Sequence, residues 1–98
     1  MMKKSINAIV INENDNVATV IEDINLGDVV VFEILGKTQE IIARENIPIY
    51  HKIAIKEVRV GEYVYKYGQK IGVATRDIQI GEHVHSHNLS SLREDLIK

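Results

Sequence analysis

The chain has 98 residues, 45% hydrophobic and 27% charged, which is enough for one modest core and one domain, residues 1–98. Twelve basic and 14 acidic side chains give a formal net charge of −2, which argues against nucleic acid as a partner. The absence of cysteine excludes disulfides and thiolate chemistry, and without a long apolar run we expect no signal peptide, no membrane span and a cytoplasmic location.

The first part of the chain predicts a strand and then one short helix. Ala8–Ile11 is an apolar run rich in β-branched residues and is followed by a polar turn, as is typical of a buried strand. Asp15 stands where the N-cap of a helix would stand, because its carboxylate would accept a backbone N–H two or three residues further on. We therefore predict a short helix near residues 15–22.

The rest of the chain favours strands. Residues 29–35 and 38–43 have strand character, and Pro48, the only proline, favours a connection because it lacks a backbone donor. The tail, residues 89–96, has the pattern of one frayed helical turn capped by Ser90 or Ser91.

An internal repeat organises these elements. One pattern occurs three times, namely an acid, Ile or Val, any residue, an aliphatic residue, Gly, an acid, any residue and Val, within residues 22–30, 56–64 and 76–84. Each copy predicts a strand, a tight turn at the glycine and another strand. The glycines are unequally spaced, so the pattern favours a compact sheet assembly over a regular solenoid.

Several motifs together resemble the SAF domain that opens altronate and galactarate dehydratases. They are Asp15–Ala18, His51–Ala54, Gly61-Glu62, Lys66–Gly68, Ile71-Gly72, Ala74, Gly81-Glu82 and Val84–Leu89. The resemblance covers roughly residues 8 to 89 and follows the order of the family. It implies a mainly β fold, the β-clip, joined covalently or as a separate subunit to a larger part that removes water from a sugar acid. The small subunit of an enzyme that eliminates sulfite from sulfolactate looks similar.

The resemblance also has one departure and one consequence for partners. The family often has Gly directly before the His-Lys pair, whereas this chain has Tyr50, so we expect the backbone there to be less free to adopt a positive φ. The chain ends where the module ends, so we expect another polypeptide, a large catalytic dehydratase subunit, to supply the catalytic part. The substrate would be a sugar acid, and homo-oligomerisation stays open.

Histidines provide the sharpest chemical hypothesis. If residues 82–88 form a strand with Val84 facing the core, then His83, His85 and His87 share the opposite face at successive spacings of roughly 6.5 to 7 Å. Imidazoles in this arrangement suit divalent iron, zinc or manganese. The resemblance favours His85 and His87 as the catalytic residues and as ligands of a divalent metal, iron or manganese, completed by the large subunit. The alternative is a row of solvated histidines on an edge strand.

Substrate binding is predicted at three further places. Lys66 and Tyr67, beside a glycine turn, can donate hydrogen bonds to a substrate carboxylate, and the alternative there is a surface hairpin. Sheet pairing would bring His51, and Lys52 beside it, close to the other histidines. Asp15 and Asn16 resemble the start of the family module, with a helix cap as the alternative.

Three functions fit these observations. The favoured one is the small subunit of a lyase that does no chemistry alone. The second is a free-standing sugar-acid binding module without catalysis, and the third is a structural or chaperone-like β-clip protein with no ligand.

Overall fold

All regular elements of the described chain are β-strands. The structure is a computed structural model that describes residues 5–92. Its strands are β1 (Ala8–Ile9), β2 (Val17–Val20), β3 (Val29–Ile34), β4 (Lys37–Ile42), β5 (Lys52–Ala54), β6 (Tyr63–Lys66), β7 (Gln69–Ala74), β8 (His83–Val84) and β9 (Leu89–Ser91). The predicted mainly β class is confirmed. Within these residues no helix has the length and apolar character needed to cross a membrane.

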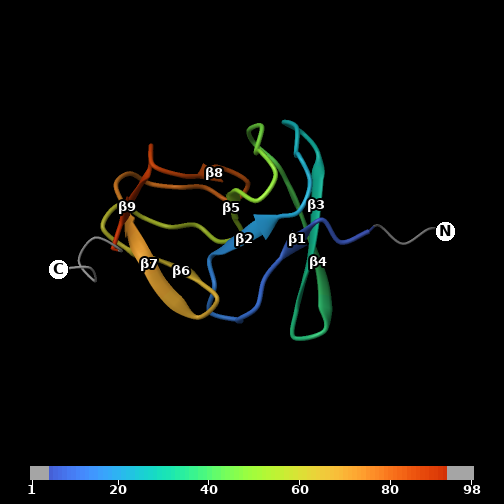
Figure 1. The fold of residues 1–98 in the computed structure, drawn as a ribbon, viewed down its shortest axis with the longest axis horizontal. Helices are drawn as coiled ribbons and strands as arrows, with labels where there is room; N and C mark the ends of the chain where they lie inside the picture. Colours follow the sequence, from blue (N-terminus) through green and yellow to red (C-terminus); the bar gives the residue numbers. More distant parts are fainter. Residues whose placement is uncertain (1–4, 93–98) are drawn as a thin grey trace.

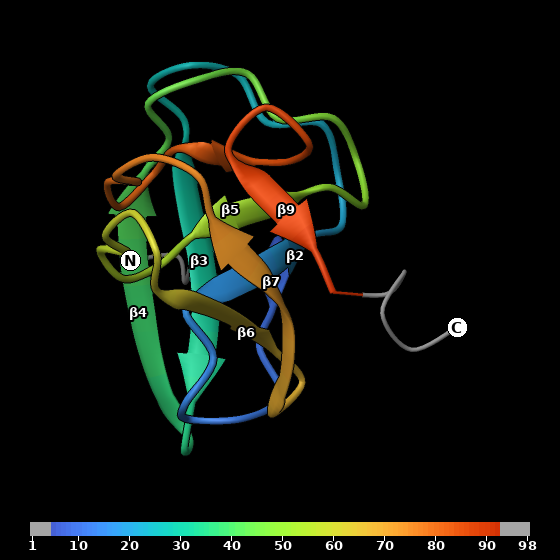
Figure 2. The same cartoon turned by 90° about the vertical axis from the view of Figure 1, so that its left-hand side faces the viewer.

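Three antiparallel sheets lie one after another (Figure 1). The central sheet has the strand order β1-β2-β5-β8, and the β3–β4 hairpin forms a separate two-stranded sheet on one side of it. The third sheet, β6-β7-β9, lies on the other side, in front of β2 and β5 in Figure 2. The central strands therefore connect two outer layers.

Two hydrophobic cores fill the spaces between the sheets. One core packs residues of β1, β2 and β5 against the β3–β4 hairpin, including Val20, Phe32 and Ile53. The other joins β5 and β8 to β6 and β7, and includes Val17 and Val84. Strand β2 contributes to both cores because alternate side chains of a strand point to opposite faces. This position explains why three of its four residues are buried.

The predicted helix near residues 15–22 is wrong. Val17–Val20 is strand β2, which pairs with β1 on one edge and with β5 on the other. Two ladders of hydrogen bonds and burial on both faces outweigh the weak helix propensity of this Val- and Thr-containing segment. The predicted helical tail also begins differently, because Leu89–Ser91 forms β9 against β7, and residues 93–96 lie outside the described part of the chain.

The internal repeat has four copies in the structure, one more than the sequence pattern predicts. The fourth copy spans residues 45–53, and isolated bridges pair the four copies two by two, Ile24 with Ile47 and Val58 with Ile78. Each turn has one residue with positive φ, namely Gly27 (92°), Tyr50 (71°), Gly61 (89°) and Gly81 (95°). Each of these donates its N–H over 2.8 Å to a carbonyl, of Ala43, Val20, Ala74 and Ala54 respectively.

Tyr50 therefore does adopt the positive φ that we expected it to disfavour. A left-handed conformation costs a residue with a side chain about 1–2 kcal/mol. The cost is offset here because the Tyr50 N–H and the His51 carbonyl both form hydrogen bonds with the backbone of Val20 in β2. These two hydrogen bonds to another strand fix the conformation of the turn. The Tyr50 side chain itself is 69% exposed.

Candidate functional site: a histidine cluster

Four histidines meet at one open surface of the protein. β5 pairs with β8 so that Ile53 lies opposite His83, which brings His51 beside β8. His51 Nδ1 lies 2.9 Å from His83 Nε2, and the His51 ring stacks on that of His85 with centroids 4.6 Å apart. The His83 ring lies 5.5 Å from His85 and 5.4 Å from His87. All four side chains of this histidine cluster are partly or fully exposed.

A turn, and not the predicted strand over residues 82–88, presents the last two histidines. β8 ends at Val84, and residues 85–88 turn back toward β9. Asn88, which is 1% exposed, organises this turn. Its Oδ1 accepts the His85 N–H over 2.9 Å, and its Nδ2 donates to the His83 carbonyl over 2.8 Å. Asn88 was missed at the sequence level, because nothing in its neighbourhood marks it as buried.

The fourth repeat explains why a histidine stands at position 51. In the other three repeats the acid after the glycine accepts the N–H of the residue three positions earlier, as in Asn25 to Asp28, Arg59 to Glu62 and Gln79 to Glu82. In the fourth repeat that donor position is Pro48, which has no N–H. The acid is not needed there, so its position is open to His51, whose ring turns to the cluster.

This substitution pattern yields a prediction about stability. Pro48→Ala restores the backbone N–H, and His51→Glu restores the carboxylate that would accept it. The free energy of unfolding of the double variant should therefore be higher, by about 0.5–1.5 kcal/mol, than the value expected from adding the effects of the two single substitutions. Chemical denaturation of the four proteins of this cycle measures the coupling. The loss of the His51–His83 contact is common to both His51→Glu proteins and cancels. Additive single effects would contradict the repeat argument.

The environment of two members of the cluster, His83 and His85, lowers their pKa values and so favours their neutral forms. The pKa of His83 is lowered by burial first and then by His51, His87 and His85, while Glu45, which accepts the His83 N–H, opposes the shift. The pKa of His85 is lowered by burial and by His51 and Lys52. Nearby imidazoles lower the pKa values of these two groups because a positive charge on one ring disfavours a positive charge on the next. Neutral imidazole is the form that accepts a proton or binds a metal.

The histidine cluster by itself does not make a metal site. Among residues 5–92, no group of three or more His, Asp or Glu side chains is arranged to hold a metal ion. The residues present fit a divalent cation only as a part of its ligands, and the other ligands would have to come from another chain.

The predicted lysines share a cavity with the cluster. Lys52 and Lys66 line an open cavity of about 350 Å³ together with His85. Tyr67 is not part of its lining. The Tyr67 hydroxyl lies 3.4 Å from the Thr19 hydroxyl, and Lys66 Nζ lies 4.9 Å from the centre of the Tyr67 ring. Residues 66–69 form the turn between β6 and β7. The predicted pair Lys66 and Tyr67 therefore lies in a hairpin turn, and Lys66 also lines the cavity.

Asp15 and Asn16 form hydrogen bonds to the β6–β7 hairpin, which carries Lys66. Asp15 is 1% exposed, and its carboxylate accepts the N–H groups of Asn12, Tyr67 and Gly68. Asn16 bonds through its side chain to the backbone of Tyr63 and Tyr65. Both side chains therefore hold the β6–β7 hairpin against the start of β2. Asp15 caps no helix, because none forms there.

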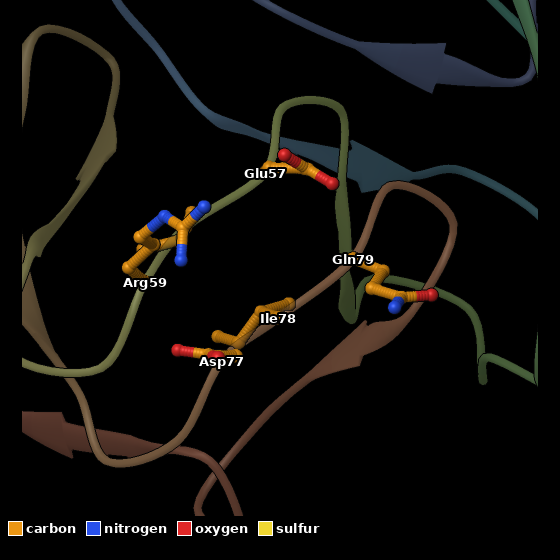
Figure 3. Close-up of a pocket in the computed structure, with 6 residues that line it drawn as sticks. Glu57, Arg59, Asp77, Ile78 and Gln79 are labelled. Carbon is orange, nitrogen blue, oxygen red and sulfur yellow. The ribbon is translucent and has the colours of Figure 1, made fainter.

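A second, smaller pocket lies between the repeats at residues 56–64 and 76–84 (Figure 3). It has a volume of about 100 Å³ and is lined by residues 57–59 and 77–79. Asp77 accepts the N–H of Val60 there, which is the role of a turn-stabilising side chain. The pocket contains none of the predicted site residues.

The fold and site define a class, a small antiparallel β module in which a histidine cluster lies on one open surface beside Lys52 and Lys66. The chain belongs to the family of the altronate/galactarate dehydratase SAF domain, whose family model matches residues 6–92. It is 35% identical over 86 residues to altronate dehydratase of Bacillus subtilis, and 37% over 82 residues to that of Escherichia coli. These matches cover 88% and 84% of this chain but only 16% of each dehydratase.

A third relative has about the same length as this chain. The (2R)-sulfolactate sulfo-lyase subunit alpha of Chromohalobacter salexigens is 34% identical over 92 residues, which cover 91% of this chain and 98% of the relative. The relatives thus include two dehydratases much longer than this chain and one lyase subunit of similar length.

Proposed function

We propose that the chain is the small subunit of a sugar-acid dehydratase, a carbon–oxygen lyase, and supplies the histidine cluster to a site that a large catalytic subunit completes. The observation that carries this proposal is the convergence of four imidazoles from two distant segments on one open surface. The similarity to a relative named as a lyase subunit alpha extends over nearly the full length of both chains and supports the two-subunit arrangement.

The chemistry of the cluster suits an elimination. Removal of water from a hydroxy acid needs a base for the proton next to the carboxylate and an acid for the departing hydroxyl, which leaves as water. His85 and His87 are the two exposed members of the cluster and take these roles. His51 and His83, joined through their ring nitrogens over 2.9 Å, can pass a proton between them.

In a second form of this proposal, His85 and His87 instead bind a divalent cation, iron or manganese, whose other ligands come from the large subunit, because a ring nitrogen that coordinates a cation cannot also transfer the proton. A bound cation would take up negative charge that develops on the substrate oxygens during elimination. Asn88 would then serve to hold the turn that carries both side chains.

The test begins with the complex. The tagged chain should copurify with a larger polypeptide, and the pair should dehydrate a sugar acid that neither converts alone. His85→Ala or His87→Ala should lower kcat of the complex at least about a hundredfold, as expected for loss of acid–base catalysis. Gln79→Ala, which changes an exposed side chain outside the cluster, is the matched control and should leave kcat unchanged. Full activity of both histidine variants would refute the proposed role.

The alternative is a free-standing sugar-acid binding module without catalysis. The open cavity beside the cluster favours it as the second candidate. Sugar-acid binding by the isolated chain, together with failure to form any complex, would support this alternative.

A further inference from the structure

The cavity beside the histidine cluster has a distinctive lining. It brings together residues from β5, β6, β7, β9 and the turn after β8. Lys52, Lys66, His85 and Ser86 provide donors, while Ile71 and Leu89 provide an apolar wall. Its volume of about 350 Å³ is in the range of small-ligand sites, roughly 300–1,000 Å³. Convergent polar groups opposite an apolar wall are typical of a pocket that orients a small molecule.

Among residues 5–92, the side chains that line this cavity carry positive charge and no negative charge. Lys52 is partly buried, and its pKa is lowered by burial and by the nearby Lys66, with no carboxylate among the causes to offset them. Two ammonium groups placed together in a partly desolvated site repel each other, so the arrangement costs free energy unless an anion joins them.

We infer that this cavity holds the acidic head group of a small hydroxylated acid, with Lys52 and Lys66 on its oxygens and the carbon chain directed past Leu89 toward His85. The inference rests on the proposed function only for the choice of a hydroxy acid. It assigns binding of the acidic group to this chain and leaves recognition of the rest of the substrate to the partner. Both ammonium groups come from one chain, so the isolated protein binds the anion without its partner.

The experiment is a titration of the isolated, isotope-labelled chain followed by NMR. Gluconate should shift the backbone resonances of residues around Lys52, Lys66 and Ser86 with a Kd of about 1 mM, as expected for a small anion in an open site. The uncharged sorbitol, which has the same carbon chain, should cause no shift at these residues. Lys52→Met and Lys66→Met should each weaken gluconate binding about tenfold, the loss of one charged hydrogen bond.

Lys70→Met is the matched control. Lys70 Nζ lies 4.2 Å from the centre of the Tyr63 ring and outside the cavity lining, so its loss removes the same charge without touching the site. Equal loss of affinity in Lys70→Met would mean that net charge alone attracts the anion, and would overturn the inference. Equal binding of sorbitol, or of inorganic phosphate, would overturn the assignment to a hydroxylated acid. Failure to find a large partner would refute the proposed function and leave the binding result intact.

Discussion

Asp15→Ala is expected to lower the free energy of unfolding by about 3–5 kcal/mol. The buried carboxylate accepts three backbone N–H groups, and two of them, from Tyr67 and Gly68, belong to the β6–β7 turn. Alanine leaves all three donors without a partner in a place that water reaches poorly. Urea denaturation followed by circular dichroism measures the change. A loss this large approaches the whole stability of a small domain, about 5–15 kcal/mol.

Asp28→Ala is the matched control for this effect. Asp28 also accepts a backbone N–H, from Asn25, but it accepts only this one and lies in an exposed turn. Its removal should cost about 1 kcal/mol. Similar losses in the two variants would show that the three hydrogen bonds of Asp15 do not act as a clamp on the hairpin.

Gly81→Ala is the second variant with a large expected effect. A Cβ at position 81 would overlap the carbonyl oxygen of Ile42 and lie 2.9 Å from Arg44 Cγ, and the backbone has a φ of 95°. The contact with backbone cannot be relieved by a rotamer change, so the repeat at residues 76–84 must move away from the end of the β3–β4 hairpin. We expect a loss of about 3–4 kcal/mol, the sum of conformational strain and steric overlap.

Gly27→Ala separates these two causes. Gly27 has a φ of 92°, almost the same as Gly81, but a Cβ there meets nothing within 4 Å. It should cost only the conformational term, about 1–2 kcal/mol. Thermal and urea unfolding of the two variants gives the comparison. Equal destabilisation would mean that the close approach of Ile42 to the repeat at residues 76–84 is unimportant. Because Gly81 lies two residues before His83, the variant should also disturb the histidine cluster.

The repeat pattern predicts the tight turns but only three of the four. A positive φ can be predicted from the sequence at Gly27, Gly61 and Gly81, because glycine adopts this conformation freely. The fourth turn has Pro48 and Tyr50 in place of the expected residues, so no local signal reveals it. Tyr50 is held in its conformation by hydrogen bonds to β2, which lies 30 residues earlier in the chain.

The sequence predicts that the histidines lie close together, but it predicts a different backbone geometry from the one observed. A seven-residue strand would place three imidazoles in a row, whereas the structure has a two-residue strand and a turn held by Asn88. Whether Asn88 points into the protein or into water depends on the packing around it. The contact of His51 with His83 depends on the pairing of β5 with β8.

The sequence by itself determined the mainly β class, the positions of three turns and the kinds of chemical groups available, because alternation and glycine placement are local properties of the chain. Only the tertiary structure decided that Val17–Val20 is a strand, that Asp15 clamps a hairpin and that Lys52 and Lys66 share a cavity with His85. These outcomes depend on contacts between residues 14 to 53 positions apart, and their free energy comes from burial and hydrogen bonds that no short segment contains.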